Sequence, residues 1–373
     1  MQVRLIHLQP AFITLALFAW LTASNVYAQS FTATAALIDQ PERTYQATDQ
    51  VNRPLAAGRA LGMCQTANQE RAQQCELIKL NGTDLTTSTK IKAQLPESHH
   101  PLYLWRYQSE SATVYLAGSI HILKPNFYPL ARPYQMAFDQ ADTLVVEVDI
   151  SALDPATIQA KSMQYGMLAS NQNLQQVLST EAYTELQAVG AEYGLPISQM
   201  SAFKPALVSQ QLAVLALVSI GYNPNSGVEA YFLNQLGQRT VLQLENLDFQ
   251  LDLLLNQPLE MQSALLQETL SQMDEFEDLT AKLVTAYLSG DDESFNQAFQ
   301  AQSGTSQLTR DFMYQLMDER NMGMAAKIQQ YLTQQGTYFV LIGAGHYVGD
   351  NSIIELLTKA GISGERIRSD AEF

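Results

Sequence analysis

Two histidines, far apart in the chain, occur in the same local pattern. His121 ends the segment VYLAGSIH and His346 ends FVLIGAGH, so an apolar run leads into a Gly-x-x-His motif in both places. Glycine lets a chain turn sharply where a strand ends, and open α/β sheets bind ligands beyond the carboxyl ends of their strands. An imidazole there can bind a divalent metal or act as a general base. The alternative is two unrelated structural histidines.

Three carboxylates are candidate partners of these histidines. Glu147 interrupts the apolar run TLVVEVDI at 143–150, and a buried charge costs free energy unless it is paired. We expect it to bind metal or orient water, or else to mark an exposed strand end. Glu245 ends the run at 240–244 in the same manner. Glu229 opens a helix, where its charge also favours the helix dipole, so both explanations stay open for it.

Arg320 and Asn321 follow two acidic residues in a helical pattern at 308–332. By local reasoning, a solvated helix face explains this pair. A guanidinium close to the two histidines would instead stabilise negative charge that develops during a reaction.

The sequence lacks the motifs of several other common catalytic and binding sites. Ser119 lies in the first histidine motif but without the Gly-x-Ser-x-Gly elbow, and the chain has neither a phosphate-binding loop nor a His-Glu-x-x-His helix. Two cysteines exclude a cysteine-based zinc finger. The net charge of -16, from 21 basic and 37 acidic residues, argues against a nucleic-acid partner, because such binding rests on Lys and Arg.

A sheet must bring the candidate residues together. Alternating or β-branched apolar runs predict strands at 102–107, 113–118, 143–150, 240–244 and 338–342, with an edge strand near Ile367. The first two should form a hairpin. Helical patterns fill the chain between, at 131–140, 154–168, 180–194, 205–220, 227–236, 258–288, 308–332 and 352–360. The prediction is an α/β fold, a mixed sheet with flanking helices and a large helical insertion at about 151–335.

The first 28 residues have the pattern of a secretory signal peptide. Arg4 supplies a positive charge, an uncharged apolar run follows at 11–21, and Ala28 ends a small-x-small cleavage site. An uncleaved anchor is the alternative. We therefore expect a periplasmic or secreted protein with no membrane span after cleavage.

Residues 29–100 differ in composition from the rest and predict an N-terminal extension that is partly helical at 57–80 and ends in a linker at 92–100. Cys64 and Cys75 are the chain's two cysteines. In an oxidising compartment a disulfide between them is the expected state, and two free thiols are the alternative.

Six short blocks of the main domain form one recognisable set: Gly118–His121, Lys204-Pro205, Gly227–Glu229, Leu244-Glu245, Arg320-Asn321 and Gly343–Gly349. Together they resemble the TraB/GumN family, also called TIKI-like, over roughly residues 101–370. Ser119 and Glu229 stand where the family has Thr and Asp. The resemblance implies a main domain at 101–373, related to erythromycin-esterase-like domains, with both histidine motifs facing one cleft. Some members of the family are similar to metal-dependent peptidases.

We therefore expect an exported metal-dependent hydrolase, most closely like a metallopeptidase. His121, Glu147 and His346 would bind a divalent metal, and Arg320 would stabilise negative charge as a further catalytic residue. Such donors suit Mn, Co, Fe or Zn. The substrate would be a peptide or small molecule, with ester hydrolysis left open. The alternative is a non-catalytic protein that sequesters a peptide or cofactor in the same cleft. The sequence leaves the oligomeric state open.

Overall fold

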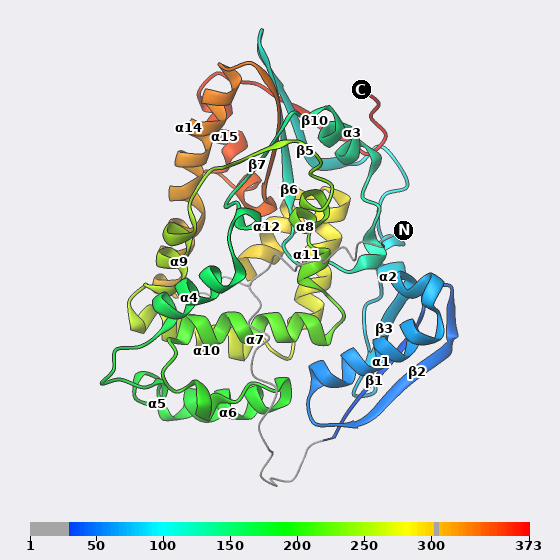
Figure 1. Ribbon diagram of the computed structural model, residues 1–373, viewed down its shortest axis with the longest axis vertical. Coiled ribbons are helices and arrows are strands. Elements are labelled where there is room, and N and C mark those ends of the chain that lie inside the picture. The colour runs from blue at the N-terminus through cyan, green and yellow to red at the C-terminus, as the bar shows by residue number, and fades with distance from the viewer. Residues whose placement is uncertain (1–29, 302–305) are drawn as a thin grey trace, which may run out of the picture.

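A mixed six-stranded sheet lies at the centre of the fold, in the order β10-β5-β6-β9-β7-β8 (Figure 1). The strands are β5 (Pro101–Gln108), β6 (Ala112–Ser119), β7 (Thr143–Val146), β8 (Thr240–Gln243), β9 (Gly336–Gly343) and β10 (Glu365–Arg368). β5 and β6 form the expected antiparallel hairpin, whereas β6, β9, β7 and β8 run parallel. The predicted α/β class is confirmed. The computed structural model describes residues 30–301 and 306–373, so the expected signal peptide at 1–28 lies outside the described residues.

Apolar sequence explains why the middle strands are interior. Val114, Leu116, Phe339, Val340 and Leu341 are all fully buried. Strands of a parallel sheet that are covered on both faces carry such continuous apolar runs. Helices provide the cover, since α3 packs on β9 and α14 packs on β6.

Helices dominate between β7 and β9, interrupted by β8, as the sequence predicted. Two expected helices are divided: 258–288 into α10 and α11, and 308–332 into α13, a π-helical turn at Tyr314–Glu319, and α14. The helices are α3 (Arg132–Gln140), α4 (Pro155–Gly166), α5 (Leu174–Val177), α6 (Thr180–Tyr193), α7 (Pro205–Ser219), α8 (Val228–Leu233), α9 (Leu247–Leu255), α10 (Leu259–Ser271), α11 (Phe276–Ser289), α12 (Asp292–Ala301), α13 (Gln307–Met313), α14 (Arg320–Leu332) and α15 (Ile353–Lys359). In the described residues, 30–301 and 306–373, no helix is long and apolar enough to cross a membrane.

The N-terminal extension contains a second, four-stranded sheet, blue in Figure 1. The helix expected around 57–80 is present as far as Ala67, in α1, whereas 75–80 forms a strand. The order of the sheet is β2-β1-β3-β4, and α1 packs on it and on α7. The Ala- and Gln-rich composition favours helix locally, but 75–80 pairs with a distant strand, and such pairing overrides local preference. The elements are β1 (Phe31–Leu37), β2 (Gln40–Gln50), α1 (Arg53–Ala67), β3 (Cys75–Leu80), β4 (Thr83–Asp84) and α2 (Ser88–Lys92).

The expected disulfide is present. Cys64 in α1 and Cys75 at the start of β3 are bonded, with their Cα atoms 6.0 Å apart. The bond therefore holds the helix of the extension against its sheet.

A buried ion pair joins the extension to the main sheet. Lys124, in the loop after β6, is 1% exposed. Its Nζ donates to Glu76 Oε1 at 3.1 Å and to the carbonyl oxygen of Thr86 at 2.9 Å. Two residues further on, Asn126 Nδ2 donates to the Gln73 carbonyl oxygen at 2.9 Å. The segment that follows His121 is thus held by the N-terminal unit.

Replacing Lys124 by Met should lower the free energy of unfolding by about 3–5 kcal/mol, because Glu76 would keep a buried charge without its partner. Urea denaturation measures this loss. Lys79→Met is the matched control, since Lys79 lies in the same strand as Glu76, β3, and forms an exposed ion pair with Asp84. This substitution should lower the free energy of unfolding by at most about 1 kcal/mol. Equal losses in the two variants would contradict the structural role given to Lys124.

Candidate active site

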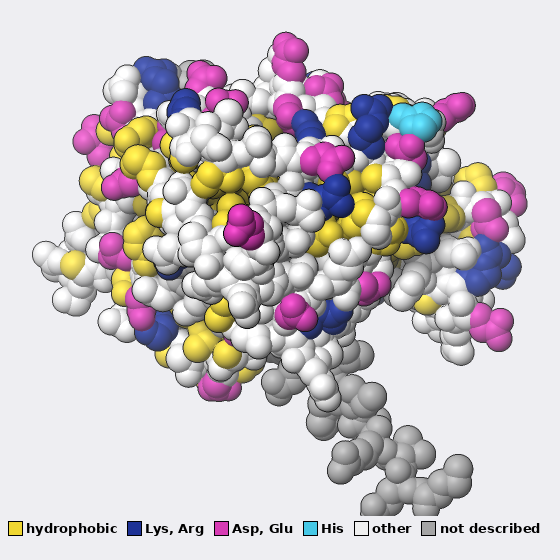
Figure 2. Space-filling view, turned by 90° about the horizontal axis from the view of Figure 1, so that it is seen from above, with side chains coloured by type: hydrophobic (Ala, Val, Ile, Leu, Met, Phe, Trp, Pro, Cys, Tyr) yellow, Lys and Arg dark blue, Asp and Glu magenta, His cyan; other side chains and the backbone are white. Residues whose placement is uncertain are grey.

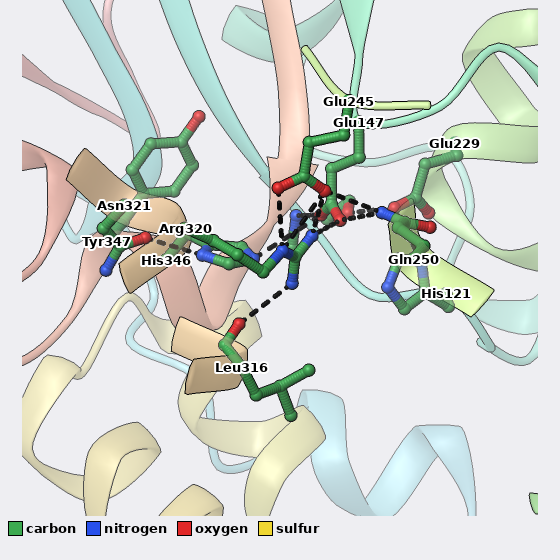
Figure 3. Close-up of polar contacts among 12 residues, drawn as sticks. His121, Glu147, Glu229, Glu245, Gln250, Leu316, Arg320, Asn321, His346 and Tyr347 are labelled. Atoms are coloured by element: carbon green, nitrogen blue, oxygen red, sulfur yellow. Dashed lines mark hydrogen bonds and ion pairs between the residues drawn. The ribbon is translucent and has the colours of Figure 1, made fainter. Parts of the chain in front are cut away.

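Four candidate side chains follow the carboxyl ends of four neighbouring parallel strands. His121 comes after β6, His346 after β9, Glu147 after β7 and Glu245 after β8. The register places Ser119 beside Gly343, and Val146 beside both Leu341 and Gln243, so the strands end at one edge of the sheet. The side chains consequently converge in space, as Figure 3 shows.

Glu147 is the centre of this cluster. Its Oε1 accepts from the Gly343 N–H at 2.8 Å and lies 3.8 Å from His346 Nε2. Its Oε2 accepts from Arg320 at 2.6 Å and from Gln250 at 3.1 Å. Burial raises the pKa of this carboxyl, but the neighbouring histidines, Arg320 and the Gly343 N–H lower it by more. The pKa of Glu147 therefore lies below its usual value, and the group is ionised at neutral pH.

His346 is anchored through its Nδ1. It is 3% exposed, and Nδ1 lies 2.7 Å from Asn321 Oδ1. Asn321 Nδ2 donates to the Asn351 carbonyl oxygen at 2.9 Å, so its Oδ1 is the end that accepts. Nδ1 therefore carries the proton, and the Nε2 lone pair lies on the side of Glu147. Burial lowers the pKa of His346, which keeps the ring neutral at pH 7.

His121 is anchored in the same way by a carboxylate. Its Nδ1 lies 2.8 Å from Glu229 Oε1, which also accepts from the Ser119 hydroxyl. The Glu229 charge raises the pKa of His121. Unlike His346, the ring of His121 is largely exposed, at 62% of its side-chain area. Its Nε2 is the nitrogen left for chemistry.

Atoms of both rings and of the central carboxylate lie close to one point beside Gly343. A Cβ atom placed on this glycine would lie 3.4 Å from Glu147 Oε1, 3.7 Å from His346 Cδ2 and 3.9 Å from His121 Nε2. The two imidazoles are thus well inside the separation of about 12 Å beyond which they could not share one ion. His121, Glu147 and His346 thus lie close together, although His346 is not among the residues that line the cavity described below. Their role as metal ligands stays a prediction.

The donors suit a metal by type and orientation. Histidine ligands of metals commonly give their second ring N–H to a carboxylate or carbonyl oxygen, as both histidines do here. Within residues 30–301 and 306–373, however, no three His, Cys, Asp or Glu side chains are gathered closely enough to hold an ion. The residues expected to bind metal therefore face a common point without standing at coordination distance.

Arg320 is buried rather than solvated, at 8% exposure. Its Nε donates to Glu245 at 2.9 Å, and one terminal nitrogen donates to both Glu147 and Glu245. The other terminal nitrogen donates to the Leu316 carbonyl oxygen at 3.0 Å. The guanidinium thus joins two carboxylates on adjacent strands.

Gln250 is a site residue that the sequence did not reveal. Its Nε2 lies 3.1 Å from oxygens of both Glu147 and Glu245. The feature of the sequence that could have indicated it is the position of this glutamine within the leucine-rich sequence LDFQLDLLL of α9. Ser119, considered above only as a nucleophile, is instead a donor to Glu229.

A cavity of about 380 Å³ opens beside these groups, with His121, Glu147, Glu229, Gln250 and Arg320 in its lining. On the face shown in Figure 2, acidic and basic side chains are interspersed without a continuous basic patch. The charged lining of the cavity is therefore the local feature that favours chemistry here.

The chain is similar to several known proteins. It is 23% identical over 297 residues to an uncharacterized protein of Treponema pallidum, covering 76% of this chain and 89% of that protein. It is 25% identical over 245 residues to the uncharacterized protein YbaP of Escherichia coli, covering 65% and 87%. It is also 25% identical over 343 residues to Metalloprotease TIKI1 of Danio rerio, covering 78% and 68%. No solved structure gives a significant match.

A family description matches the part of the chain that contains the main sheet. The match extends over residues 103–366, from β5 to β10, and includes every residue of the cluster around Glu147. The N-terminal sheet lies outside it. The chain belongs to the TraB/PrgY/gumN family.

Proposed function

We propose that this protein is a metal-dependent hydrolase of the peptidase type. The observation that carries the proposal is the convergence of two Nδ1-anchored imidazoles and one ionised carboxylate on a point beside Gly343. His121, Glu147 and His346 would hold the ion, which could be Mn, Co, Fe or Zn. When bound, a divalent metal activates water and polarises a carbonyl. The similarity to a protein named as a metalloprotease supports the peptidase class.

The chain's own residues would prepare this site. Glu229 and Asn321 hold the two rings through their Nδ1 atoms, which leaves each Nε2 for a ligand. Arg320 and Gln250 bind Oε2 of Glu147, which leaves Oε1 beside Gly343. Preorganised donors of this kind need little rearrangement when charge develops during a reaction.

A metal-free hydrolase is a second candidate, because the described residues do not gather three ligands at coordination distance. In that case the His121–Glu229 pair would act as the general base in the form that has lost the Nε2 proton, with the carboxylate orienting the ring and Nε2 then removing a proton from water. Because the Glu229 charge raises the pKa of His121 to about 9, this form gains population as the pH rises toward that value. The substrate could then be an ester.

Export and domain organisation belong to the same proposal. We infer that residues 1–28 direct export to the periplasm or medium, and that 101–373 is the catalytic domain, with 29–100 as an attached unit. The Cys64–Cys75 bond supports this, because disulfides persist in oxidising compartments.

Export predicts a mature N-terminus near Gln29. N-terminal sequencing of protein recovered from cell fractions measures it directly. Intact Met1 in the cytoplasmic fraction would refute the assignment.

His121→Ala and His346→Gln should each remove bound metal and lower turnover of a peptide library by roughly 10²–10⁴-fold, because each loses a ligand or base. Metal analysis and peptide turnover are the measurements, with circular dichroism to confirm folding. His99→Ala is the control, since this exposed ring pairs with Asp370 outside the cluster. If both site variants keep metal and turnover, the proposed site is wrong.

Asn321→Ala should weaken metal binding or activity about 10–100-fold, because the ring of His346 loses the acceptor that fixes its proton and orientation. Titration of the metal-free protein with Mn²⁺ or Zn²⁺ gives the affinity. Asn351→Ala is the comparison, since its backbone carbonyl still accepts from Asn321, and it should change the affinity far less.

Dialysis against a chelator separates the two candidates. A metal-dependent enzyme should lose turnover and regain it when a divalent ion returns, because the ion activates the water. Full turnover of protein shown to contain no metal would instead favour the His121–Glu229 base.

A further inference from the structure

The loop that carries His121 and the segment that leads to Glu229 are bound to each other through their backbones. We call residues 120–126 the histidine loop. Two amide groups of 223–228 donate to carbonyl oxygens of this loop at 3.0 Å, Asn223 to Leu123 and Val228 to Ile120. Gly227 lies so close to the loop that a Cβ atom there would be 2.1 Å from the His121 carbonyl oxygen. The parts of the chain that bring Nδ1 of His121 to Glu229 therefore hold each other in place.

Lys124 connects the histidine loop to the N-terminal unit, residues 30–100. Its buried Nζ lies 5.0 Å from the centre of the Tyr222 ring, in the segment before α8, and donates to Glu76 in β3. Glu76 is itself fixed, because the N–H and the hydroxyl of Ser88 donate to its two oxygens at 2.6 and 2.7 Å. One ammonium group therefore joins the histidine loop, the segment before α8 and the N-terminal sheet.

Asn126 gives the loop a second connection to the same unit. Its side chain donates to the Gln73 carbonyl oxygen at 2.9 Å, and its own carbonyl oxygen accepts from Lys92 Nζ at 2.6 Å. The family match at 103–366 includes the histidine loop but not the N-terminal unit. A part of the chain beyond the family domain thus fixes a loop of the site.

We propose that the N-terminal unit positions the active site, because its hold on the histidine loop keeps the ring of His121 against Glu229. Glu76 and Lys124 are then positioning residues, which act through the loop and do not touch substrate. The inference rests on the proposed function for the chemistry of the site and gives the N-terminal unit a part in it. Small displacements are enough for an effect, since a shift of about 1 Å in a reacting group can lower a rate by about 100-fold.

Histidine ring signals in nuclear magnetic resonance test the proposal without requiring metal or turnover. The chain has five histidines to label with ¹³C and ¹⁵N, and His121→Ala and His346→Gln assign the two signals of the site. Lys124→Met should displace or broaden the His121 signal, because the loop is released, and should leave the His346 signal in place. Peptide turnover should fall by about 10–100-fold in the same variant.

Leu186→Ala is the control for lost stability. Leu186 is fully buried in a core cluster of α6, α7 and α10, and a cavity there lowers stability as the loss of a buried charge partner does. This variant should leave the His121 signal and the turnover of the folded protein unchanged. If Lys124→Met and Leu186→Ala give the same His121 signal and the same turnover, the ion pair only stabilises the fold and the inference is overturned.

Asn126→Ala takes the place of Lys124→Met if that variant does not fold, because it removes a single hydrogen bond to the N-terminal unit. It should change the His121 signal in the same sense but by less, and an unchanged signal would overturn the inference. A changed His121 signal, in a protein whose parent shows neither bound metal nor turnover, would leave the positioning of His121 standing and refute the hydrolase.

Discussion

Two carboxylates stand side by side at the ends of neighbouring parallel strands, and their burial requires a cation between them. The Glu245 N–H donates to the Glu147 carbonyl oxygen at 2.8 Å, so the two residues are adjacent in the backbone as well. Buried carboxylates that share one site disfavour each other's ionisation. Arg320 removes this conflict, because its planar fork donates to both groups at once. Because Arg320 is the first residue of α14, this pairing holds the start of the helix beside the two carboxylates.

The Arg320 guanidinium also connects the two carboxylates to the helical segment that carries it. Arg320 is the first residue of α14, and its remaining nitrogen is held by Leu316 in the π-helical turn just before it. Such turns are rare and occur frequently at functional sites. Oε2 of Glu147 is occupied by Arg320 and Gln250, whereas Oε1 accepts from the Gly343 N–H and lies 3.8 Å from His346 Nε2. The two oxygens of one carboxylate therefore have different surroundings.

The sequence predicted the parts of this site that have a local signal. His121, Glu147 and His346 each follow an apolar strand, so their positions at strand ends could be inferred. The expected glycine turn holds for Gly343, which ends β9, but Gly118 lies within β6, where a Cβ atom would come within 2.8 Å of Tyr103 Cβ. The order of those strands could not, because sheet pairing joins segments far apart in the chain. Arg320 looked like part of a solvated face, since the carboxylates that bury it lie elsewhere in the sequence. The N-terminal sheet was missed for the same reason, as helix-favouring composition at 57–80 conceals a strand that pairs with β1.

The strand order has a consequence for how the molecule matures. β9 lies between β6 and β7 in the sheet, although it follows both of them by a long helical segment in the chain. Until this late strand inserts, the ends that carry His121 and Glu147 are not neighbours and nothing holds them at a common point. An incompletely synthesised or partly folded chain thus has no assembled site.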